Sequence, residues 1–283
     1  MTREIFDRRT ALALLASGGA VVALPPPAFA ARTADVSDSL LTYLRIRSRL
    51  DGRRSFYPYR GTIFGRPFGQ SAVPLFNVEG FSWDQLIPLS DRHYRLDTAE
   101  AGYFLDLKTG LPLDIWTNPL NGVETQVKHY RSFAHVIVSD GKLEPVIGAT
   151  PTAGMQMTAS MSAPTVLNNR IWIHEDIIAR IPNKPSASFK DPREYAGPFL
   201  DAASLATWSA DIRDLVDPQR AFVPATLSYQ TLGSWRPFMR MGQTPGLISW
   251  RMFGSKEPTI QKVPLGLSQR VLKDYPDFLT REI

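Results

Sequence analysis

Apolar and polar positions follow a helical rhythm near the start of the globular part of the chain. Over residues 37–50, apolar side chains such as Leu40 and Leu44 recur at intervals of three to four residues. Ser37 or Asp38 can act as the N-cap by accepting a hydrogen bond from a backbone N–H. This spacing predicts a helix over residues 37–50.

Two later stretches have similar spacing. Leu205 and Trp208 lie in a run that begins at the capping residue Asp201 and ends at Leu215. A shorter run covers residues 265–272 near the end of the chain. The pattern therefore predicts a helix from Asp201 to Leu215 and a short terminal helix.

Between these stretches the pattern is typical of strands. Aromatic-rich runs are bounded by Gly and Pro, and Asp140-Gly141 is a residue pair preferred in tight hairpins. Residues 166–181 fit neither the helical nor the strand period cleanly. The predicted strands cover residues 57–65, 73–81, 92–96, 101–107, 111–116, 124–138, 143–147, 155–161, 222–232 and 247–253.

This order of elements predicts a mostly β fold. Many short strands with few helices favour an antiparallel sheet or a barrel-like, calycin-like sheet with a few helices packed on one side. An open α+β sheet is the alternative. The chain has no internal repeats and no linker long enough to divide it, so residues 31–283 are expected to form a single β-rich domain.

The first thirty residues have the three parts of an export signal. Arg8 and Arg9 precede an apolar run over residues 11–24, and Ala28-Phe29-Ala30 is a small-residue cleavage site. The apolar run is shorter than the roughly 20 residues needed to span a bilayer. The paired arginines favour the twin-arginine route. We therefore expect a cleaved signal over residues 1–30, the twin-arginine export machinery as a partner, and a periplasmic protein.

Charge and cysteine content exclude some classes of partner and of chemical site. The chain carries a net charge of +5, and removing the leader's three basic and two acidic residues leaves +4, with both signs mixed along the sequence. The basic run over residues 45–54 alternates with apolar residues and predicts a solvated helix face, so no nucleic-acid partner is expected. Because the chain has no cysteine, disulfides, thiolate metal sites and cysteine nucleophiles are excluded.

Several common motifs are missing from the sequence. It has no Gly-x-Gly-x-x-Gly, no phosphate-binding loop and no Gly-x-Ser-x-Gly elbow. Dinucleotide, nucleotide and typical esterase chemistry therefore lose support, and no cofactor is expected.

Two blocks far apart in the chain carry distinctive motifs. The first runs from Tyr103 to Gly110 and continues through Trp116-Thr-Asn-Pro119 and Gly122 to Val127-Lys-His129; the second is Gly233–Gly242 followed by Pro245-Gly246 and Trp250–Gly254. Together they resemble the family known as domain of unknown function 1838, which occurs in bacteria and fungi. The resemblance extends over nearly all of the mature chain. It implies a shared fold and no particular reaction, because the family's function is uncharacterised.

Histidines are natural candidates for proton transfer, because imidazole changes charge near neutral pH. On one unbroken strand over residues 124–138, His129 and His135 face the same side, with Arg131 between them. We expect these three residues to be catalytic, Arg131 binding an anionic group. The two imidazoles would lie roughly 20 Å apart, too far to bind one metal ion together. No metal ligands are therefore assigned, although His174 beside two acidic residues leaves a metal option open, and each histidine can instead be structural.

The two motif blocks also supply the side chains of a small-molecule pocket. Aromatic rings, an amide and guanidinium groups together suit an apolar or aromatic ligand that bears an acidic group. The sequence predicts an exported, cofactor-independent enzyme that uses acid–base chemistry on such a compound, as a lyase, decarboxylase, isomerase or hydrolase. The alternative is a periplasmic binding or carrier protein without catalysis. The expected substrate-binding residues are Trp116, Asn118, Trp235, Arg236, Arg240 and Trp250.

Overall fold

The computed structural model describes residues 36, 38–146, 154–185, 189 and 191–280. Eleven of the described strands form one antiparallel sheet. In the order in which they lie side by side, they are β7 (Lys142–Val146), β6 (Tyr130–Ser139), β3 (His93–Leu105), β2 (Val73–Ser90), β1 (Ser55–Pro67), β13 (Gly246–Ser255), β12 (Ala225–Gly233), β11 (Phe199–Asp211), β10 (Arg170–Pro182) and β8 (Gln156–Met161), while β9 (Thr165–Leu167) pairs with β10 alone.

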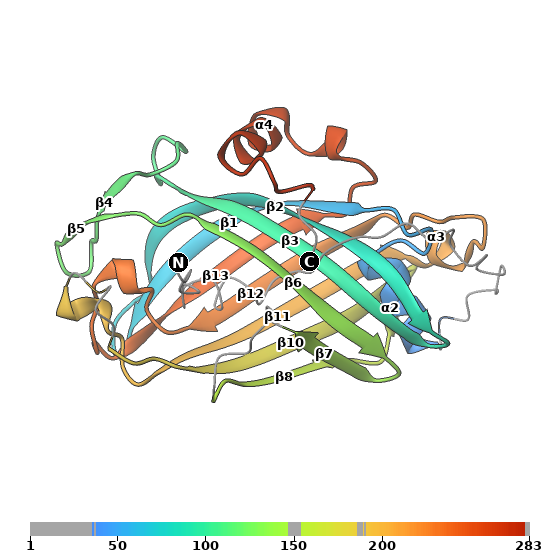
Figure 1. Ribbon diagram of the computed structural model, residues 1–283, viewed down its shortest axis with the longest axis horizontal. Coiled ribbons are helices and arrows are strands. Elements are labelled where there is room, and N and C mark those ends of the chain that lie inside the picture. The colour runs from blue at the N-terminus through green and yellow to red at the C-terminus, as the bar shows by residue number, and fades with distance from the viewer. Residues whose placement is uncertain (1–35, 37, 147–153, 186–188, 190, 281–283) are drawn as a thin grey trace, which may run out of the picture.

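This sheet curls into a nearly closed barrel (Figure 1). Strands β7 and β8, at the two ends of the path, contact each other, although no ladder joins them within the described parts of the chain. A small separate sheet of β4 (Ile115–Thr117) and β5 (Glu124–Gln126) lies at one end of the barrel (Figure 1). The prediction of a mostly β, barrel-like fold is confirmed.

Three described α-helices accompany the barrel. Helix α2 (Ser39–Arg47) lies at the end away from β4 and β5, and α4 (Leu265–Asp274) lies against the outer face of the wall (Figure 1). The short α3 (Ile212–Val216) follows β11. The predicted helices near residues 37–50 and 265–272 are confirmed, and Asp38 is the N-cap of α2, accepting a hydrogen bond from Leu41 N at 3.0 Å. The short 3-10 helices are η2 (Pro192–Glu194), η3 (Pro237–Met239) and η4 (Ile260–Lys262).

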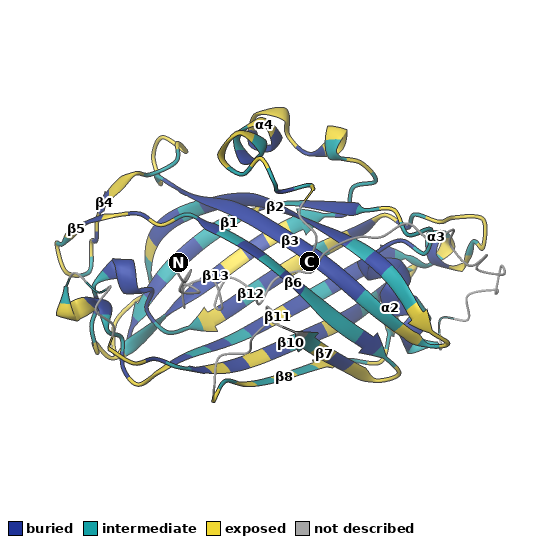
Figure 2. Cartoon of the chain, in the orientation of Figure 1, coloured by how far each residue is buried: buried dark blue, intermediate teal, exposed yellow. Residues whose placement is uncertain are grey.

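Side chains alternate between the interior and the outer face of the barrel wall, as strand geometry requires. On β3, Leu96, Glu100 and Phe104 face the interior, whereas Ala99 and Tyr103 face outward. Most of β2 and β3 is buried on both faces (Figure 2). The barrel therefore has a polar and aromatic interior and a second, outer hydrophobic cluster beneath α4.

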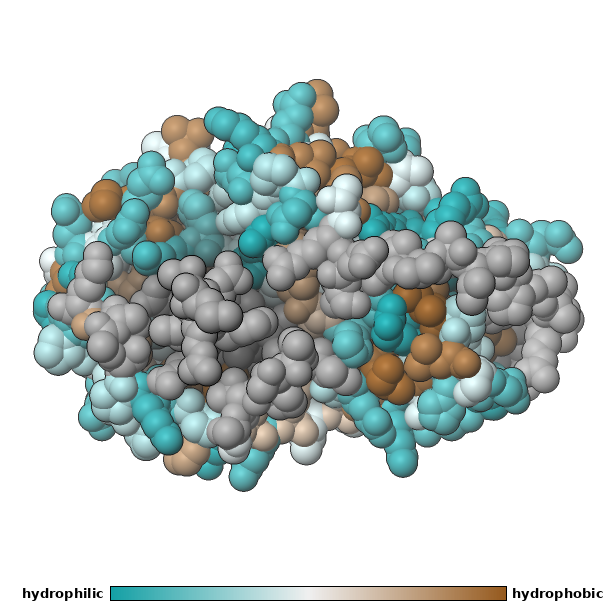
Figure 3. All heavy atoms as spheres, viewed as in Figure 1, coloured by the Kyte–Doolittle hydropathy of each residue, from teal (hydrophilic) through white to brown (hydrophobic). Residues whose placement is uncertain are grey.

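The C-terminal residues cover that outer cluster. Trp83 Nε1 donates a hydrogen bond to the carbonyl of Phe278 at 2.9 Å, and Tyr103 donates one to Asp274 at 2.8 Å. Figure 3 shows apolar side chains mixed with polar ones around α4 at the top of the view. The outer polar contacts of β2 and β3 thus hold the C-terminal segment in place.

The helix predicted from Asp201 to Leu215 is wrong. Residues up to Asp211 belong to β11, and only Ile212–Val216 is helical, with Asp211 as its N-cap. The inward positions of β11 carry mostly Ala and Ser, so the period-two pattern is weak and the spacing of Leu205 and Trp208 imitates a helix. Pairing with β10 and β12 on both sides decides the structure.

The interpretation of the basic run as a solvated helix face is also wrong. Arg45, Arg47 and Arg49 are all buried, because they carry the packing between α2 and the end of the barrel. Arg45 donates hydrogen bonds to the carbonyls of Asp217 and Arg220 at 2.8 and 2.9 Å. The alternation of charged and apolar residues here reflects polar contacts to the barrel and not exposure to solvent.

The hairpin predicted at Asp140-Gly141 joins β6 to β7, and Gly141 has the left-handed φ of 69° that such a turn requires. No helix in the described parts of the chain has the length and apolar character of a membrane span. The predicted export signal over residues 1–30 lies outside the described residues.

Candidate functional site

A hydrogen-bonded row of three buried polar side chains, which we call the central chain, lies along the inner wall of the barrel. Tyr59 on β1 donates a hydrogen bond to Glu100 Oε1 at 2.6 Å, and the hydroxyls of Tyr59 and Tyr130 are 2.7 Å apart. Because a phenol has one hydrogen and Tyr59 gives it to Glu100, the hydroxyl of Tyr130 donates to Tyr59. Three strands, β1, β3 and β6, thus place two phenols in line with one carboxyl group.

Two glycines make this arrangement possible. Gly80 and Gly102 are paired across β2 and β3, and both face the interior. A Cβ at Gly102 would lie less than 3.0 Å from the hydroxyls of both Tyr130 and Tyr59, and one at Gly80 would meet the Tyr59 hydroxyl. The two tyrosines therefore lie flat across a part of the wall that has no side chains of its own, a close approach that only glycine permits.

The environment of Glu100 sets its protonation near neutral pH. The residue is 2% exposed, and burial raises the pKa of its carboxyl to about 7, although the Tyr59 hydrogen bond and the charge of Arg236 favour the ionised form. Its second oxygen, Oε2, is buried and has no hydrogen-bond partner among the described residues. Glu100 therefore has one oxygen fixed by a phenol and one oxygen available for proton exchange.

Arg236 and Trp250 adjoin this chain, and both were predicted as substrate-binding residues. The Arg236 guanidinium lies over the Trp250 ring, 5.1 Å from its centroid, and the Trp250 ring packs edge-on to Tyr130 at 5.5 Å. Burial lowers the pKa of Arg236 to about 10, which leaves it protonated at neutral pH. The barrel interior thus contains a guanidinium charge that acts on Glu100, Tyr130 and Tyr229.

A second group of hydroxyls lies on the opposite part of the wall. Tyr229 on β12 donates a hydrogen bond to Ser204 Oγ at 2.9 Å, and Ser204 Oγ lies 3.2 Å from Thr231 Oγ1. The sheet order places β11 and β12 across the barrel from β3. The inner surface is therefore polar on both sides of Glu100.

Another polar cluster, which we call the end plug, closes the barrel beneath α2. It consists of Arg47, Asp84, Glu175, Tyr43 and Trp208. Arg47 forms an ion pair with Asp84, and its Nε lies 3.3 Å from Glu175 Oε2. Tyr43 and Trp208 each donate a hydrogen bond to Glu175 Oε2 at 3.1 Å. The end plug joins α2 to the three strands β2, β10 and β11. Both of its carboxylates, Asp84 and Glu175, have partners.

The three residues predicted as catalytic do not lie on one continuous strand. The strand predicted over residues 124–138 is divided, since β5 ends at Gln126 and β6 begins at Tyr130, and His129 lies in the break. Its Nδ1 accepts a hydrogen bond from Phe104 N at 3.2 Å. The prediction of one continuous histidine face is therefore wrong.

Arg131 and His135 lie on the outer side of the wall, because Tyr130 and the other even-numbered residues of β6 face inward. Arg131 forms an ion pair with Asp277 at 2.6 Å and lies over the Tyr275 ring at 5.0 Å. His135 is paired with Asp97 across β3, also on the outer face. Burial lowers the pKa of both His129 and His135, which keeps the imidazoles neutral at pH 7. The ion pair between Arg131 and Asp277 anchors the C-terminal segment to the outer face of β6.

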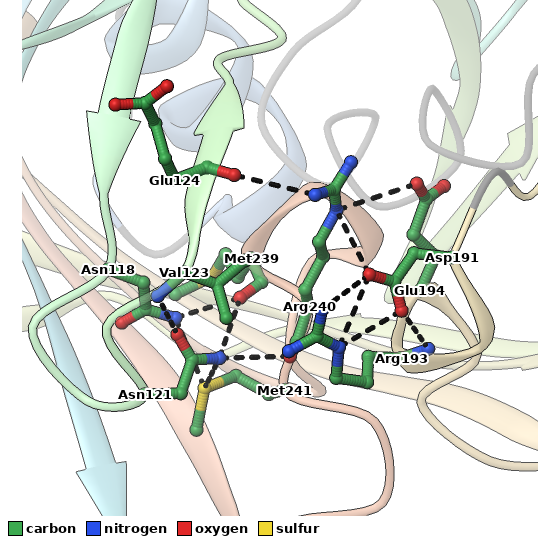
Figure 4. A network of polar contacts seen from close by, with 10 residues as sticks. All are labelled: Asn118, Asn121, Val123, Glu124, Asp191, Arg193, Glu194, Met239, Arg240 and Met241. Atoms are coloured by element: carbon green, nitrogen blue, oxygen red, sulfur yellow. Dashed lines mark hydrogen bonds and ion pairs between the residues drawn. The ribbon is translucent and has the colours of Figure 1, made fainter.

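The two motif blocks do converge, at the end of the barrel formed by β4 and β5. Asn118 Nδ2 donates hydrogen bonds to the Met239 carbonyl at 2.8 Å and to Met241 Sδ at 3.2 Å, and Asn121 Nδ2 donates one to the Arg240 carbonyl at 2.9 Å (Figure 4). These amides join the β4–β5 hairpin to η3 and the residues that follow it. The two blocks, which were expected to supply one pocket together, therefore lie side by side.

The other predicted binding residues take part in the same junction. Trp116 packs on Phe76 with ring centroids 4.3 Å apart, and Trp235 Nε1 donates a hydrogen bond to the Thr244 carbonyl at 2.8 Å. Arg240 extends from η3 toward Asp191 and Glu194, with N–O distances of 3.8 and 3.9 Å (Figure 4). Of the six predicted binding residues, Arg236 and Trp250 adjoin the central chain, while the other four join segments at the barrel end.

No group of three or more metal-binding side chains is found among the described residues. His174 lies on the outer face, where its Nδ1 is 3.0 Å from Thr207 Oγ1. Sequence reasoning missed Tyr59, Glu100 and Tyr130, which come from three separate strands. Gly80 and Gly102, placed inside strands, were the available signal, since an interior glycine often marks a close approach.

Comparison with known proteins places the chain in a family. It matches the family model described as "Protein of unknown function (DUF1838)" over residues 52–282. A solved structure with a YmcC-like fold from Bacteroides fragilis NCTC 9343 shares 8% identity, with 71% of this chain and 93% of that chain covered, at a TM-score of 0.19. A score this low establishes no common fold. No curated protein matches the chain. Because the family model covers most of the sequence, including both motif blocks, the protein belongs to the DUF1838 family.

Proposed function

We propose that the protein is a cofactor-independent enzyme that acts by acid–base chemistry on a small apolar or aromatic compound held inside the barrel. The observation that carries this proposal is the Glu100 carboxyl, which is buried, fixed at Oε1 and open at Oε2 among the described residues. A carboxyl with a pKa of about 7 is suited to both accepting and returning a proton at neutral pH.

The neighbouring groups have complementary roles in this proposal. Tyr59 and Tyr130 hold the carboxyl by the hydrogen-bonded chain and stabilise its ionised form. Arg236 supplies positive charge that can stabilise an anion developing on the compound, and Trp250 offers an aromatic surface. Glu100 therefore takes the role of proton carrier that the sequence had assigned to His129 and His135.

The expected reactions are those that move a proton without a redox change, namely isomerisation, decarboxylation, elimination by a lyase, or hydrolysis. Each can proceed with a carboxylate base and a positive group beside the developing charge. We further propose that the protein is exported by the twin-arginine route, cleaved after residue 30 and active in the periplasm. The sequence of the first thirty residues supports this location.

A binding or carrier protein is the second candidate. The rings of Phe76, Phe104, Trp250 and Tyr130 form a continuous aromatic group inside the barrel, and such a surface holds an apolar molecule without any proton transfer. Turnover separates the two candidates, because a carrier does not need a titrating carboxyl.

The test begins with the small molecules that co-purify with the exported protein. These are identified by mass spectrometry and then incubated with the wild-type protein, Glu100→Gln and Glu79→Gln. Glu79 is the matched control, a buried glutamate on the outer face of β2 paired with Arg60 and Arg270. The enzyme proposal predicts turnover by the wild type and Glu79→Gln, with at least a 100-fold loss in Glu100→Gln. Equal turnover by all three proteins, or none by any of them, would contradict it.

A further inference from the structure

Several polar atoms of the barrel interior have no hydrogen-bond partner among the described residues, and three of them belong to β3, β6 and β13. They are Glu100 Oε2, Ser132 Oγ and Trp250 Nε1, and their residues are 2%, 1% and 5% exposed. An unpaired buried polar atom costs on the order of 1–3 kcal/mol, so such atoms normally have a partner. Three of them around one site point to a group that is bound there during function.

These atoms come from neighbouring positions. Glu100 on β3 and Ser132 on β6 are direct partners across the strand pair, which places their Cβ atoms about 5 Å apart. Tyr130 lies two residues before Ser132 on the same inner face, and its ring packs against Trp250 at 5.5 Å. The residues that carry the three open atoms are therefore neighbours of Tyr130, across the strand pair or by ring contact.

Their chemistry defines the group that fits between them. Glu100 Oε2 accepts a hydrogen bond when ionised and donates one when protonated, the Ser132 hydroxyl can do either, and Trp250 Nε1 only donates. A ligand oxygen that carries a hydrogen satisfies this set, because it donates to the carboxylate and accepts from the other two. A carbonyl or ether oxygen has no hydrogen to give to the Glu100 carboxylate.

The facing wall carries mainly short side chains. Ala134 on β6, Ala179 on β10, and Ala202, Ser204 and Ala206 on β11 present short side chains to the interior. An eight-stranded barrel is already wide enough to hold one small ligand, and ten strands surround this interior. Beside these short side chains lie the rings of Trp250 and Tyr130, which suit a flat apolar body.

We infer that the site binds a small planar compound with a phenolic or enolic hydroxyl, placed between Glu100 Oε2 and Ser132 Oγ with its apolar body against Trp250. This inference rests on the proposed function and names its substrate class. When Glu100 is ionised, the carboxylate takes the proton of the hydroxyl and the guanidinium of Arg236 stabilises the resulting oxyanion. Returning the proton to the same oxygen or to a conjugated carbon completes the transfer without any other reactant.

Three matched probes test this assignment: 2-naphthol, 2-methoxynaphthalene and naphthalene. They share a flat ring system, but only the first has a hydroxyl hydrogen. Their affinities for the purified full-length protein are measured by fluorescence titration. A hydrogen bond to a charged group predicts that 2-naphthol binds at least tenfold more tightly than the other two. Equal affinity for the three probes, or no binding of 2-naphthol, would overturn the inference.

Variants then locate the binding. Ser132→Ala and Glu100→Gln are expected to weaken 2-naphthol binding about tenfold and to leave naphthalene binding unchanged, whereas Glu79→Gln should change neither. The same loss in Glu79→Gln would place the hydroxyl elsewhere. The probe comparison in the wild type stands even where a variant folds poorly. Glu100-dependent turnover of a compound without a hydroxyl would refute this substrate class while leaving the proposed function intact.

Discussion

The end plug and the central chain are both buried polar networks in one barrel, and they are built on opposite principles. In the end plug, Asp84 and Glu175 face the permanent charge of Arg47, and both carboxylates are held by partners. In the central chain, Glu100 is held by a phenol at one oxygen and left open at the other.

The difference separates a structural network from a functional one. The ion pair between Arg47 and Asp84 fixes α2 to the barrel, as the hydrogen bond from Lys256 Nζ to the Arg45 carbonyl at 2.7 Å also does, although burial raises the pKa of the Asp84 carboxyl to about 7. Glu100 has a similar pKa of about 7, but its neighbours are neutral phenols and its Oε2 has no hydrogen-bond partner among the described residues, so this oxygen is open for proton exchange. Burial and its effect on the carboxyl pKa are similar in the two places, whereas the kind of partner and the open oxygen differ.

The largest expected effect comes from breaking the end plug. Arg47→Ala leaves Asp84 and Glu175 buried without their cation, which predicts a loss of about 3–5 kcal/mol in the free energy of unfolding. Urea unfolding measures it. Arg53→Ala is the control, since that side chain is 72% exposed and its ion pair contributes at most about 1 kcal/mol. A similar small change for both variants would show that the plug does not hold the fold.

The next effect is a pH dependence that belongs to Glu100. Its pKa rises from 4.5 in the unfolded chain to about 7, so between these values the folded state holds a proton that the unfolded state has lost. Stability from this group is therefore present at low pH and falls by about 3 kcal/mol as the pH rises from 4.5 to 7. Subtracting the unfolding free energy of Glu100→Gln from that of the wild type at each pH isolates this slope.

An exposed carboxylate provides the contrast for that experiment. Hydrogen bonds from the backbone of Thr109 and Lys108 lower the pKa of Asp106, so its contribution is lost only as the pH falls below its ordinary value. Asp106→Asn should leave the window from pH 4.5 to 7 unchanged. A flat difference for Glu100→Gln across the same window would contradict the assignment of its pKa.

Adding a side chain to the glycine floor, by which we mean Gly80 and Gly102 beneath the two tyrosines, should have an intermediate effect. A methyl group at Gly102 collides with the hydroxyls of Tyr130 and Tyr59, and such overpacking costs about 1–3 kcal/mol. Gly102→Ala should also weaken 2-naphthol binding, because the phenols move. Gly266→Ala in α4, where a Cβ meets nothing within 4 Å, should be neutral or slightly stabilising. Thermal unfolding that ranks the two variants equally would argue against a special role for the floor.

The smallest effect is expected at Arg240. Its ion pairs are long and its φ of 50° is left-handed, which glycine adopts more easily. Arg240→Gly should therefore change the unfolding free energy by less than about 1 kcal/mol and leave ligand binding unchanged. Titration with 2-naphthol and urea unfolding check both points, and a large loss of binding would restore Arg240 to the site.

The sequence predicted the architecture better than the site, for a physical reason. Local signals such as the Asp38 cap and the Asp140-Gly141 turn report nearby geometry, and both were placed correctly. The two motif blocks were also expected to lie together, and they do, although Asn118 joins them through hydrogen bonds where it was expected to bind substrate. Strand β11 was misread because its inward Ala and Ser residues carry little hydrophobic contrast.

The central chain depends on information that no local pattern contains. Tyr59, Glu100 and Tyr130 meet only once the register of β1, β2, β3 and β6 is known. The break in the predicted strand at His129 also depends on where the pairing of β6 begins. Because β6 begins at Tyr130, the predicted catalytic residue His129 lies outside the strand. The sequence analysis assigned proton transfer to histidines, whereas the register brings two tyrosines and a glutamate together.

The most direct test is a carbon-13 NMR titration of the Glu100 side-chain carboxyl, assigned by comparison with Glu100→Gln. The structure predicts a midpoint at about pH 7 and a further change in this signal when 2-naphthol is added. A midpoint near the ordinary value of 4.5, with no response to 2-naphthol, would contradict the claim that the centre of the barrel is a proton-exchanging ligand site.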